Sequence, residues 1–401
     1  MRYDYCIIGA GIVGLSSAMQ LLKRFPGASI VVIERADGPA TYQTGRNSGV
    51  IHAGVYYAPG SLKARYCREG LRDTMAFCDS HGIPYDQCGK LIVATSSLQL
   101  ERLGALEDRA RQNGLHVERL DRAQLAEREP NISGLGALLV AETGIVDYGA
   151  VSRGFANVFA ASGGEVRYQC DCIGIREEAD RVVVETTKGT IEARCVVACA
   201  GVQADRIARA AGLDLDFRIV PFRGDYYRLP ANRDNLIKHL IYPVPDPDLP
   251  FLGVHLTRMI GGFITVGPNA AMALSREKYG RYDVSPRDAA DLAGYSGTWR
   301  MLWKNRRSAL AELASALSPR RYLELCRKYC PSLSLDDLQP YPSGIRAQAV
   351  SRDGTLLHDF LIRSTARTIH ICNAPSPAAT AALPIGRHIV ETICEHQTVR
   401  A

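Results

Sequence analysis

Apolar and polar positions along the first 34 residues predict a strand, a helix and a second strand. Three apolar residues, Cys6-Ile7-Ile8, form a short strand that leads into a glycine-rich segment. Beyond it, apolar residues recur every three or four positions, as on one face of a helix: Leu15, Ala18, Met19 and Leu22. A second apolar strand covers residues 30–33 and ends in Glu34. This order is typical of the unit that opens an α/β fold with a parallel sheet.

The glycine-rich segment, Gly9-Ala10-Gly11-Ile12-Val13-Gly14, predicts a nucleotide site. Gly9 lets the strand turn sharply, Gly11 lets the backbone approach a pyrophosphate, and Gly14 lets helix and strand pack closely. The pyrophosphate would bind the unpaired N–H groups at the positive end of the helix. Glu34, twenty residues beyond Gly14, would accept hydrogen bonds from a ribose 2′-OH, which disfavours NADP. In this order, the elements predict a site for an ADP-containing dinucleotide.

Later segments predict that the nucleotide domain is discontinuous. Residues 44–58 are small and polar, as in a loop that wraps a cofactor. A second strand, 195–199, also ends in an Ala-Gly turn, Ala200-Gly201, that would approach the same dinucleotide. We further expect helices at 62–81, 98–113, 121–128, 151–161 and 205–211, strands at 90–94, 165–175 and 369–372, a hairpin at 181–192, mostly strands at 219–266, helices at 287–330, and a final helix entered through 373–383 and ending near Cys394.

Composition and charge add little beyond an ordinary globular chain. With 401 residues, 46% of them hydrophobic, there is room for two domains. A net charge of +6, without a basic tract or zinc-finger spacing, gives no reason to expect nucleic acid. The 12 cysteines are expected to be reduced thiols, and none has a paired zinc spacing, so no metal is expected. No apolar run is long enough to span a membrane and the chain opens on a strand, so we expect a cytoplasmic protein.

Several longer stretches carry a family resemblance. The N-terminal fingerprint, the 44–57 loop, the 198–201 turn and the 373–380 segment resemble FAD-dependent oxidoreductases of the D-amino-acid oxidase/glycerol-3-phosphate dehydrogenase superfamily. More specific stretches resemble the L-2-hydroxyglutarate oxidase/dehydrogenase family over essentially the full length: 44–68, Pro221-Phe222-Arg223-Gly224, 239–247, 253–259, 266–269 and 373–382. One departure is alanine where the superfamily usually has glycine in the last flavin loop, Ser376-Pro377-Ala378-Ala379-Thr380.

The resemblance implies a noncovalent FAD, oxidation of L-2-hydroxyglutarate to 2-oxoglutarate, and electron transfer to a quinone or oxygen. It implies a Rossmann-like FAD-binding domain from residues 1–85, 145–215 and 340–401, and an α+β substrate domain with a mixed or antiparallel sheet from 86–144 and 216–339. FAD also suits the four separated nucleotide segments better than NAD does. Two alternatives stay open: oxidation of another small 2-hydroxy acid or amino acid, and a flavin-binding redox sensor without catalysis.

The candidate cofactor residues come from these separated segments. In the last of them, we expect Ser376-Pro377 to open the final helix and to aim its dipole at the flavin N1–C2=O edge, where negative charge develops on reduction. The full set is Gly9, Gly11, Ile12, Val13, Gly14, Glu34, Arg35, Thr44, Asn47, Ser48, Gly49, Cys172, Ala200, Gly201, Ser376, Pro377, Ala378, Ala379 and Thr380.

Two histidines are candidates for the base that removes the hydroxyl proton while hydride leaves the α-carbon. A base should have a pKa near neutral, which favours histidine. His52 lies in the cofactor-wrapping loop and His255 on an expected strand of the substrate sheet. The alternative for each is a core histidine hydrogen-bonded to the backbone.

A five-carbon dicarboxylate needs cationic or hydroxyl partners at both ends. Arginine suits the α-carboxylate because its fork binds both oxygens and stays charged. The resemblance to the superfamily implies that Arg346 lies where the chain crosses from the substrate sheet back to the flavin. The further candidates are Tyr57, Lys63, Arg223, Tyr242 and Arg258.

A basic, tryptophan-containing stretch, 299–307, suggests how electrons leave. Trp299 and Trp303 with four cations on one expected helix suit an anionic membrane surface, where a quinone is within reach. We therefore also consider a peripheral position on the cytoplasmic face of the inner membrane. The alternative is a solvated helix that covers the sheet and buries its aromatic side chains.

Overall fold

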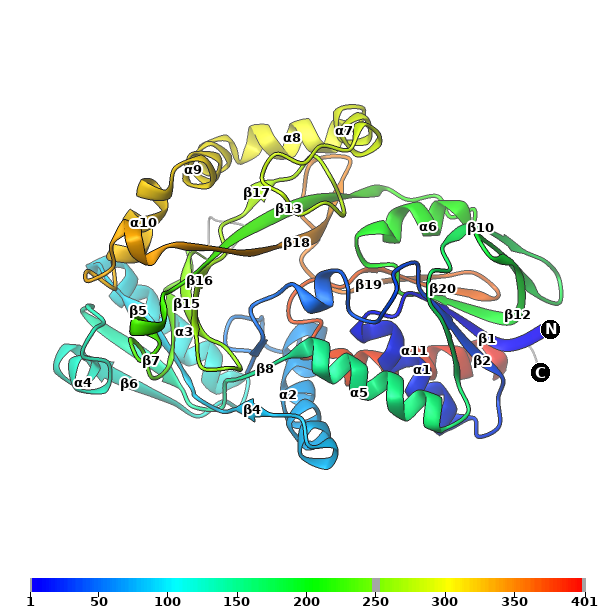
Figure 1. Ribbon diagram of the computed structural model, residues 1–401, viewed down its shortest axis with the longest axis horizontal. Coiled ribbons are helices and arrows are strands. Elements are labelled where there is room, and N and C mark those ends of the chain that lie inside the picture. The colour runs from blue at the N-terminus through cyan, green and yellow to red at the C-terminus, as the bar shows by residue number, and fades with distance from the viewer. Residues whose placement is uncertain (1, 247–252, 399–401) are drawn as a thin grey trace.

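The computed structural model describes residues 2–246 and 253–398, and three sheets organise them (Figure 1). The first sheet has the strand order β10-β11-β12-β1-β2-β9, with β20 beside β12 and β19 beside β20. Its strands are β1 (Arg2–Ile8), β2 (Ile30–Ile33), β9 (Glu165–Arg167), β10 (Cys172–Glu177), β11 (Val182–Thr186), β12 (Gly189–Ala198), β19 (Leu361–Ser364) and β20 (Thr368–Asn373). The central pairs β12–β1, β1–β2, β2–β9 and β12–β20 are parallel, as expected for a Rossmann-like sheet.

The second sheet is mixed, with the order β17-β13-β16-β15-β14-β5-β7-β6 and β18 beside β13. Its strands are β5 (Lys90–Ala94), β6 (Val117–Asp121), β7 (Gly136–Val140), β13 (Phe217–Arg228), β14 (Leu240–Pro243), β15 (His255–Arg258), β16 (Ile264–Gly267), β17 (Ala271–Met272) and β18 (Gln339–Ser351). Strands β5 and β14 run parallel, whereas β13 and β18 form a long antiparallel pair. A small third sheet joins β3 (Val50–Ile51), β8 (Gly144–Val146) and β4 (Tyr85–Asp86).

Helices cover both large sheets. In Figure 1, α1 and α11 lie together beneath the first sheet, while α7 to α10 form an arch over β13 and β18. The helices are α1 (Ile12–Arg24), α2 (Leu62–His81), α3 (Ser97–Gln112), α4 (Arg122–Arg128), α5 (Tyr148–Ala161), α6 (Ala204–Ala210), α7 (Pro286–Ala293), α8 (Ser296–Lys304), α9 (Arg306–Leu317), α10 (Pro319–Arg327) and α11 (Ala382–Thr398). Short 3-10 turns are η1 (Gln43–Gly45), η2 (Gly201–Gln203), η3 (Ala231–Arg233) and η4 (Leu335–Asp337). Within the described residues, the helices include none that is long and apolar enough to cross a membrane.

Local sequence explains where the principal helices begin and end. Ser61 caps α2 by accepting a hydrogen bond from the Ala64 N–H, and Gly82 ends it in the left-handed conformation. The helix predicted over 62–81 is therefore confirmed to the residue. Asp121 caps α4 with a reciprocal capping box.

Three expectations about elements were wrong. The strand expected over 165–175 is two strands, β9 and β10, because the backbone leaves the sheet at Gln169, whose φ is 54°. The basic stretch 299–307 does not lie on one helix, since α8 ends before Asn305 and α9 begins after it. The final helix begins at Ala382 rather than at Ser376-Pro377.

Assigning domains by sheet remains our proposal. Most boundaries expected from the sequence fall between the strands of the two large sheets. The boundaries at 85 and 144 divide β4 and β8 of the third sheet, and the boundary at 340 falls inside β18, which pairs with β13 of the second sheet. We therefore propose that the last boundary between the substrate domain and the FAD-binding domain lies after Ser351, at the end of β18.

Candidate active site

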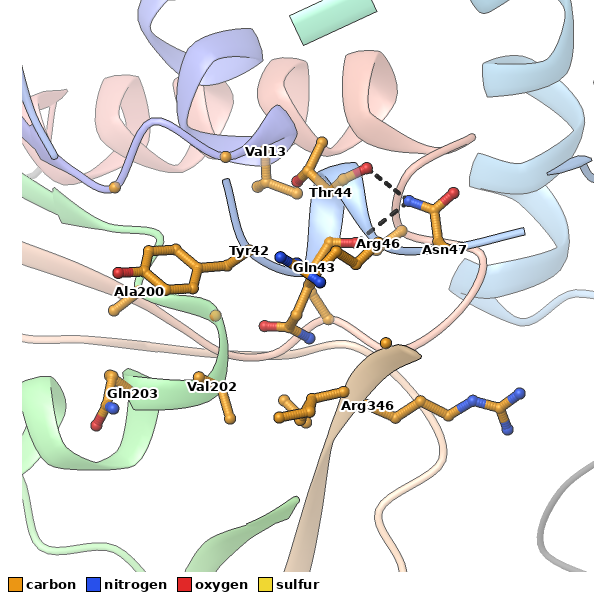
Figure 2. Close-up of a pocket in the computed structure, with 18 of the residues that line it drawn as sticks. Val13, Tyr42, Gln43, Thr44, Arg46, Asn47, Ala200, Val202, Gln203 and Arg346 are labelled. Carbon is orange, nitrogen blue, oxygen red and sulfur yellow. Dashed lines mark hydrogen bonds between the residues drawn. The ribbon is translucent and has the colours of Figure 1, made fainter. Parts of the chain in front are cut away.

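A cavity of about 980 Å³ lies between the two large sheets, at the upper end of the range for small-molecule sites. It is lined by the C-terminal ends of β1, β2 and β12, by the 40–57 loop, and by residues of β13, β14, β15 and β18. Figure 2 shows residues from these separated segments, among them Thr44, Ala200 and Arg346, converging on one space.

At one end, which we call the nucleotide end, the three glycines have distinct roles. Gly9 has φ of 103°, and a Cβ there would meet the Cys199 carbonyl oxygen at 2.5 Å. A Cβ on Gly14 would meet the Gly9 carbonyl oxygen at 2.0 Å, so helix and strand touch here. Gly11 faces the cavity at the start of α1 and offers no side-chain cap. The Ile12 N–H donates to Thr44 Oγ1, and the positive end of the helix still faces the cavity, which fits a pyrophosphate.

The acid expected to bind a ribose also holds the glycine turn in place. The Glu34 carboxylate accepts hydrogen bonds from the Ala10 N–H at 2.8 Å and from the Ala36 N–H at 2.9 Å, one on each oxygen. Each oxygen keeps a second lone pair for a ribose hydroxyl. The neighbouring Arg35 forms an ion pair with Glu277, and both residues line this end of the cavity.

Side chains of the cofactor-wrapping loop hydrogen-bond to the start of α1 and to the loop's own backbone. Thr44 Oγ1 accepts from the Ile12 N–H at 3.1 Å. The Asn47 amide donates to the Thr44 carbonyl at 2.6 Å and to the Gln43 carbonyl at 3.2 Å (Figure 2). Gly49 does not line the cavity; its φ is 66° and its N–H donates to Asn47 Oδ1, so it serves the loop's turn.

The segment 376–380 is a series of turns before α11, not the first turn of the helix. The Ala378 N–H donates to Pro375 and the Ala381 N–H donates to Pro377. Thr380 anchors the segment, since its hydroxyl lies 2.7 Å from the Tyr148 hydroxyl and accepts from the His52 N–H at 3.1 Å. These turns, rather than a helix dipole at Ser376, present the segment to the cavity.

The cavity lining includes all but one of the cofactor residues expected from the sequence, Gly49 being the exception. They are Gly9, Gly11, Ile12, Val13, Gly14, Glu34, Arg35, Thr44, Asn47, Ser48, Cys172, Ala200, Gly201, Ser376, Pro377, Ala378, Ala379 and Thr380.

At the other end, which we call the reactive end, His255 is held in a defined tautomer. Its Nδ1 lies 3.1 Å from the Gly253 carbonyl oxygen, which can only accept, so Nδ1 carries the hydrogen. The ring stacks on Tyr242 with centroids 3.9 Å apart. Its Nε2 is buried and has no hydrogen-bond partner among the described residues. Burial lowers the pKa of His255 to about 3, so Nε2 is an unprotonated acceptor at neutral pH.

His52 also lines the reactive end, and its backbone is held by two hydrogen bonds. Its N–H donates to Thr380 and its carbonyl accepts from the Cys67 thiol at 3.1 Å. Burial, followed by the charges of Lys90, His255 and Arg346, lowers the pKa of His52 to about 3. Both histidines are thus neutral, and they lie close enough to interact.

Of the six substrate candidates, four line the cavity: Tyr57, Lys63, Tyr242 and Arg346. Arg346 extends from β18 away from the residues of the nucleotide end (Figure 2). Burial lowers the pKa of Lys63 to about 8. Burial also raises the pKa of Tyr57 well above its ordinary value, so its hydroxyl stays protonated.

The other two candidates lie elsewhere, which corrects the expectation. Arg223 is buried and pairs with Asp225, Nε to Oδ1 at 2.8 Å, because residues two apart on a strand share a face. Arg258 pairs with Asp86 at 3.3 Å and donates to the Lys238 carbonyl. Neither lines the cavity, so we assign neither to the substrate.

Charge is divided unevenly along the cavity. The lining carboxylates are Glu34, Asp171, Glu277 and Asp288. All four belong to the nucleotide end: Glu277 pairs with Arg35, and Asp288 pairs with Arg206 of α6. The described lining of the reactive end has the cations Lys63 and Arg346 and no carboxylate. Such a surface suits an anionic substrate.

The sequence reasoning missed several lining residues. Tyr42, Gln43 and Arg46 lie in the same loop as Thr44, and Tyr56 adjoins Tyr57, so their position in the loop was an available signal. Others, such as Gln203, Tyr226 and Gln348, reach the cavity through the packing of distant elements and carry no local signal.

A Rossmann-like sheet, a glycine turn that fits a pyrophosphate and a second, mixed sheet that lines the same cavity are the features of a dinucleotide-binding protein. Comparison with protein families makes the class specific. The chain belongs to the FAD dependent oxidoreductase family, whose model matches residues 4–392. It is therefore an FAD-dependent oxidoreductase, and FAD is its cofactor.

Individual relatives agree over nearly the whole chain. It is 53% identical to L-2-hydroxyglutarate dehydrogenase of Escherichia coli strain K12 over 392 residues, 98% of this chain and 93% of that protein. It is 52% identical to the enzyme of the same name from Salmonella houtenae, with the same coverage. Its fold resembles that of the FAD-bound, dithionite-reduced L-alpha-glycerophosphate oxidase of Mycoplasma pneumoniae, with a TM-score of 0.80, 21% identity, and 97% and 94% of the two chains covered.

Proposed function

We propose that this protein oxidises L-2-hydroxyglutarate to 2-oxoglutarate. The observation that carries the proposal is the reactive end itself, where cationic side chains and an unpartnered histidine acceptor meet without any lining carboxylate among the described residues. A substrate with two carboxylates and one hydroxyl matches that set of groups. The names of the similar Escherichia coli and Salmonella proteins support the same substrate.

In the proposed reaction, two hydrogens leave the substrate's α-carbon and hydroxyl group. When bound, FAD would supply at flavin N5 the acceptor for a hydride, which leaves the α-carbon with both electrons of its C–H bond. The hydroxyl proton moves to His255 Nε2 as the C=O double bond forms. His255 is suited to this role because the Gly253 carbonyl fixes its tautomer and Tyr242 fixes its ring plane. We assign His52 to substrate contact, since no such orientation is evident for its ring.

The remaining cavity residues orient the substrate. Arg346 provides a fork for the α-carboxylate, while Lys63 and the Tyr57 hydroxyl are placed to bind the distal carboxylate. The glycine turn and the open start of α1 would hold the cofactor's pyrophosphate, Glu34 its ribose, and the 44–48 and 376–380 segments its flavin half. The position of these residues in the lining of the cavity supports the proposed assignments.

Anaerobic titration of the purified protein with L-2-hydroxyglutarate tests the proposal. We expect loss of the oxidised flavin's visible absorbance with this substrate, and none with D-2-hydroxyglutarate or L-lactate. Bleaching by L-lactate or an amino acid instead would assign the site to another small acid. A flavin that no small acid bleaches would favour the redox-sensor alternative.

We also propose that electrons leave at an anionic membrane surface, where a quinone accepts them. The arch of α8 and α9 exposes large apolar side chains, with exposed fractions of 59% for Trp299, 73% for Trp303 and 66% for Leu310. Leu313 and Leu317 extend this surface, and Arg300, Lys304, Arg306 and Arg307 flank it. Apolar side chains beside cations suit the interface of an anionic bilayer. We call these nine residues the arch surface; oxygen is the alternative acceptor.

Sedimentation with lipid vesicles tests the arch surface. The wild type should bind vesicles that contain phosphatidylglycerol and should bind neutral vesicles less. Trp303→Ser combined with Leu310→Ser should abolish binding, whereas Leu98→Ser, which alters an exposed leucine of α3, should not. Equal binding of both variants would exclude the arch surface as the contact.

A further inference from the structure

Lys90 is a buried lysine that the proposed reaction leaves without a role. It opens β5, and its residue is entirely inaccessible to solvent. In the parallel register Lys90 pairs with Leu240 and Ile92 pairs with Tyr242. Alternate residues of a strand share a face, so Lys90 is on the same sheet face as Ile92, Leu240 and Tyr242. Burying a charged amine on an otherwise apolar face lowers the free energy of unfolding. The presence of a lysine at this position therefore calls for an explanation.

The immediate surroundings of the Lys90 ammonium are two aromatic rings of the cavity wall. Its Nζ lies 4.6 Å from the centre of the Tyr56 ring and 5.1 Å from that of the Tyr242 ring. Both tyrosines line the cavity, whereas Lys90 is behind them. Among residues 2–246 and 253–398, Nζ has no hydrogen-bond partner, and the same is true of the Tyr56 hydroxyl and of His255 Nε2. Three unsatisfied polar atoms therefore lie in or directly behind the wall of the reactive end.

The titratable groups that act on or near Lys90 come from several packed elements. Cys67 of α2 raises its pKa slightly against the larger effect of burial, which lowers the pKa to about 7. The positive charge of Lys90 in turn contributes to lowering the pKa of His52 and of His255. Tyr56 and Tyr242 face it with neutral hydroxyls, since burial raises the pKa of both. No carboxylate is among these groups, so the counter-ion for a charged Lys90 is not supplied by them.

We propose that Lys90 is a positioning residue that supplies positive charge, through the Tyr56 and Tyr242 rings, to a dianionic substrate in the cavity. This inference rests on the proposed function and adds the source of its preference for dicarboxylates. Because the group is on the apolar side of the wall, its charge acts through a medium of low dielectric and is poorly screened. A dianion favours the protonated form of Lys90, so binding takes up a proton above pH 7.

The pH dependence of dicarboxylate binding follows from this coupling. If the site binds a dianion about tenfold better when Lys90 is protonated, the apparent dissociation constant rises by about tenfold in total between about pH 7 and about pH 8, and Lys90 adds no further change at higher pH. Lys63, whose pKa burial lowers to about 8, adds a second step. His52 and His255, with pKa values of about 3, contribute no step between about pH 6 and pH 9.

Glutarate is a suitable probe because it has both carboxylates and no hydroxyl to oxidise. Its binding to the FAD-loaded protein is measured by the change in flavin absorbance and by calorimetry in buffers of different ionisation enthalpy. We expect Lys90→Met to weaken glutarate binding about tenfold at about pH 6, as for a charge acting across a low-dielectric layer. Proton uptake should fall in the same variant. Lys90→Arg should keep the affinity, without a proton-uptake step from this position.

Two controls separate charge from packing. Lys63→Met should remove the change in glutarate affinity near pH 8 and keep the change near pH 7 that we assign to Lys90. Butyrate, a monoanion of similar length, should lose much less affinity than glutarate in Lys90→Met. In Lys90→Met, the effect on flavin reduction by L-2-hydroxyglutarate should be seen as a higher half-saturating concentration, because the charge of Lys90 acts on substrate binding.

Each outcome decides for or against the inference. Unchanged glutarate affinity and proton uptake in Lys90→Met would refute it, and so would an equal loss of butyrate affinity. Failure of the proposed function is distinguishable, because L-2-hydroxyglutarate would then not bleach the flavin although glutarate binding could still depend on Lys90.

Discussion

The buried Lys90 gives a quantitative prediction about folding. In the unfolded chain a lysine is protonated below its ordinary pKa of 10.5, whereas in the folded protein it stays neutral down to about pH 7. Between these values the unfolded state binds one more proton, so stability falls as the pH is lowered from 10.5 to 7. A difference of 3.5 pKa units lowers the free energy of unfolding by about 5 kcal/mol. This loss of stability is complete below pH 7 and absent above pH 10.5. Wild-type Lys90 therefore destabilises the fold most at neutral and acidic pH.

Replacing Lys90 with methionine keeps the volume of the side chain and removes the charge. We expect Lys90→Met to be more stable than the wild type by about 5 kcal/mol at pH 6, by about half of that near pH 9, and by almost nothing above pH 10.5. Denaturant unfolding followed by far-UV circular dichroism at several pH values measures these differences.

The shape of the pH dependence decides the outcome. Lys328→Met serves as the control, because Lys328 is exposed just after α10 and its removal should change stability little at any pH. A Lys90→Met difference that is the same at pH 6 and pH 10, or that is destabilising at pH 6, would contradict a neutral buried amine.

Three further predictions concern the cavity. His255→Gln should retain FAD but slow flavin reduction by about a hundredfold or more, since the base is lost. Stopped-flow absorbance measures the rate of flavin reduction. If His52→Gln reduces its flavin as slowly as His255→Gln, the assignment of His255 as the base is contradicted. Arg346→Met should raise the KM for L-2-hydroxyglutarate about tenfold to a hundredfold through loss of a charged hydrogen-bonding partner, with steady-state kinetics as the assay and FAD content as the control. Gly70→Ala should weaken FAD retention and destabilise the fold by about 1–3 kcal/mol, because a Cβ there would lie 2.1 Å from the Thr380 carbonyl oxygen; unchanged flavin content after gel filtration would show that the 376–380 segment adapts.

The nucleotide end could be predicted from sequence because its chemistry is local. The spacing of Gly9, Gly11 and Gly14 is set by one turn and one helix start, and a short segment encodes both. Glu34 follows from the length of that helix and the next strand. The helix over 62–81 was equally legible, since Ser61 and Gly82 mark its ends.

The reactive end was less predictable because it depends on which strands become neighbours. Lys90 reads as the first residue of an apolar strand, and only the pairing of β5 with β14 places it behind Tyr242. Arg223 does not line the cavity and pairs with Asp225, and this spacing of two residues is a pattern that the sequence does show. The site roles themselves stay predictions until the variants are measured.

The uneven distribution of charge along the cavity has a consequence for turnover. The proposed product, 2-oxoglutarate, has the same two carboxylates as the proposed substrate, so in the proposed roles Arg346, Lys63 and Lys90 would attract both alike. Attraction that does not discriminate between substrate and product raises the association rate of the ligand and lowers its dissociation rate. We therefore expect fast substrate association at low salt and a turnover rate that is limited by product release. We also expect 2-oxoglutarate to inhibit the enzyme as it accumulates.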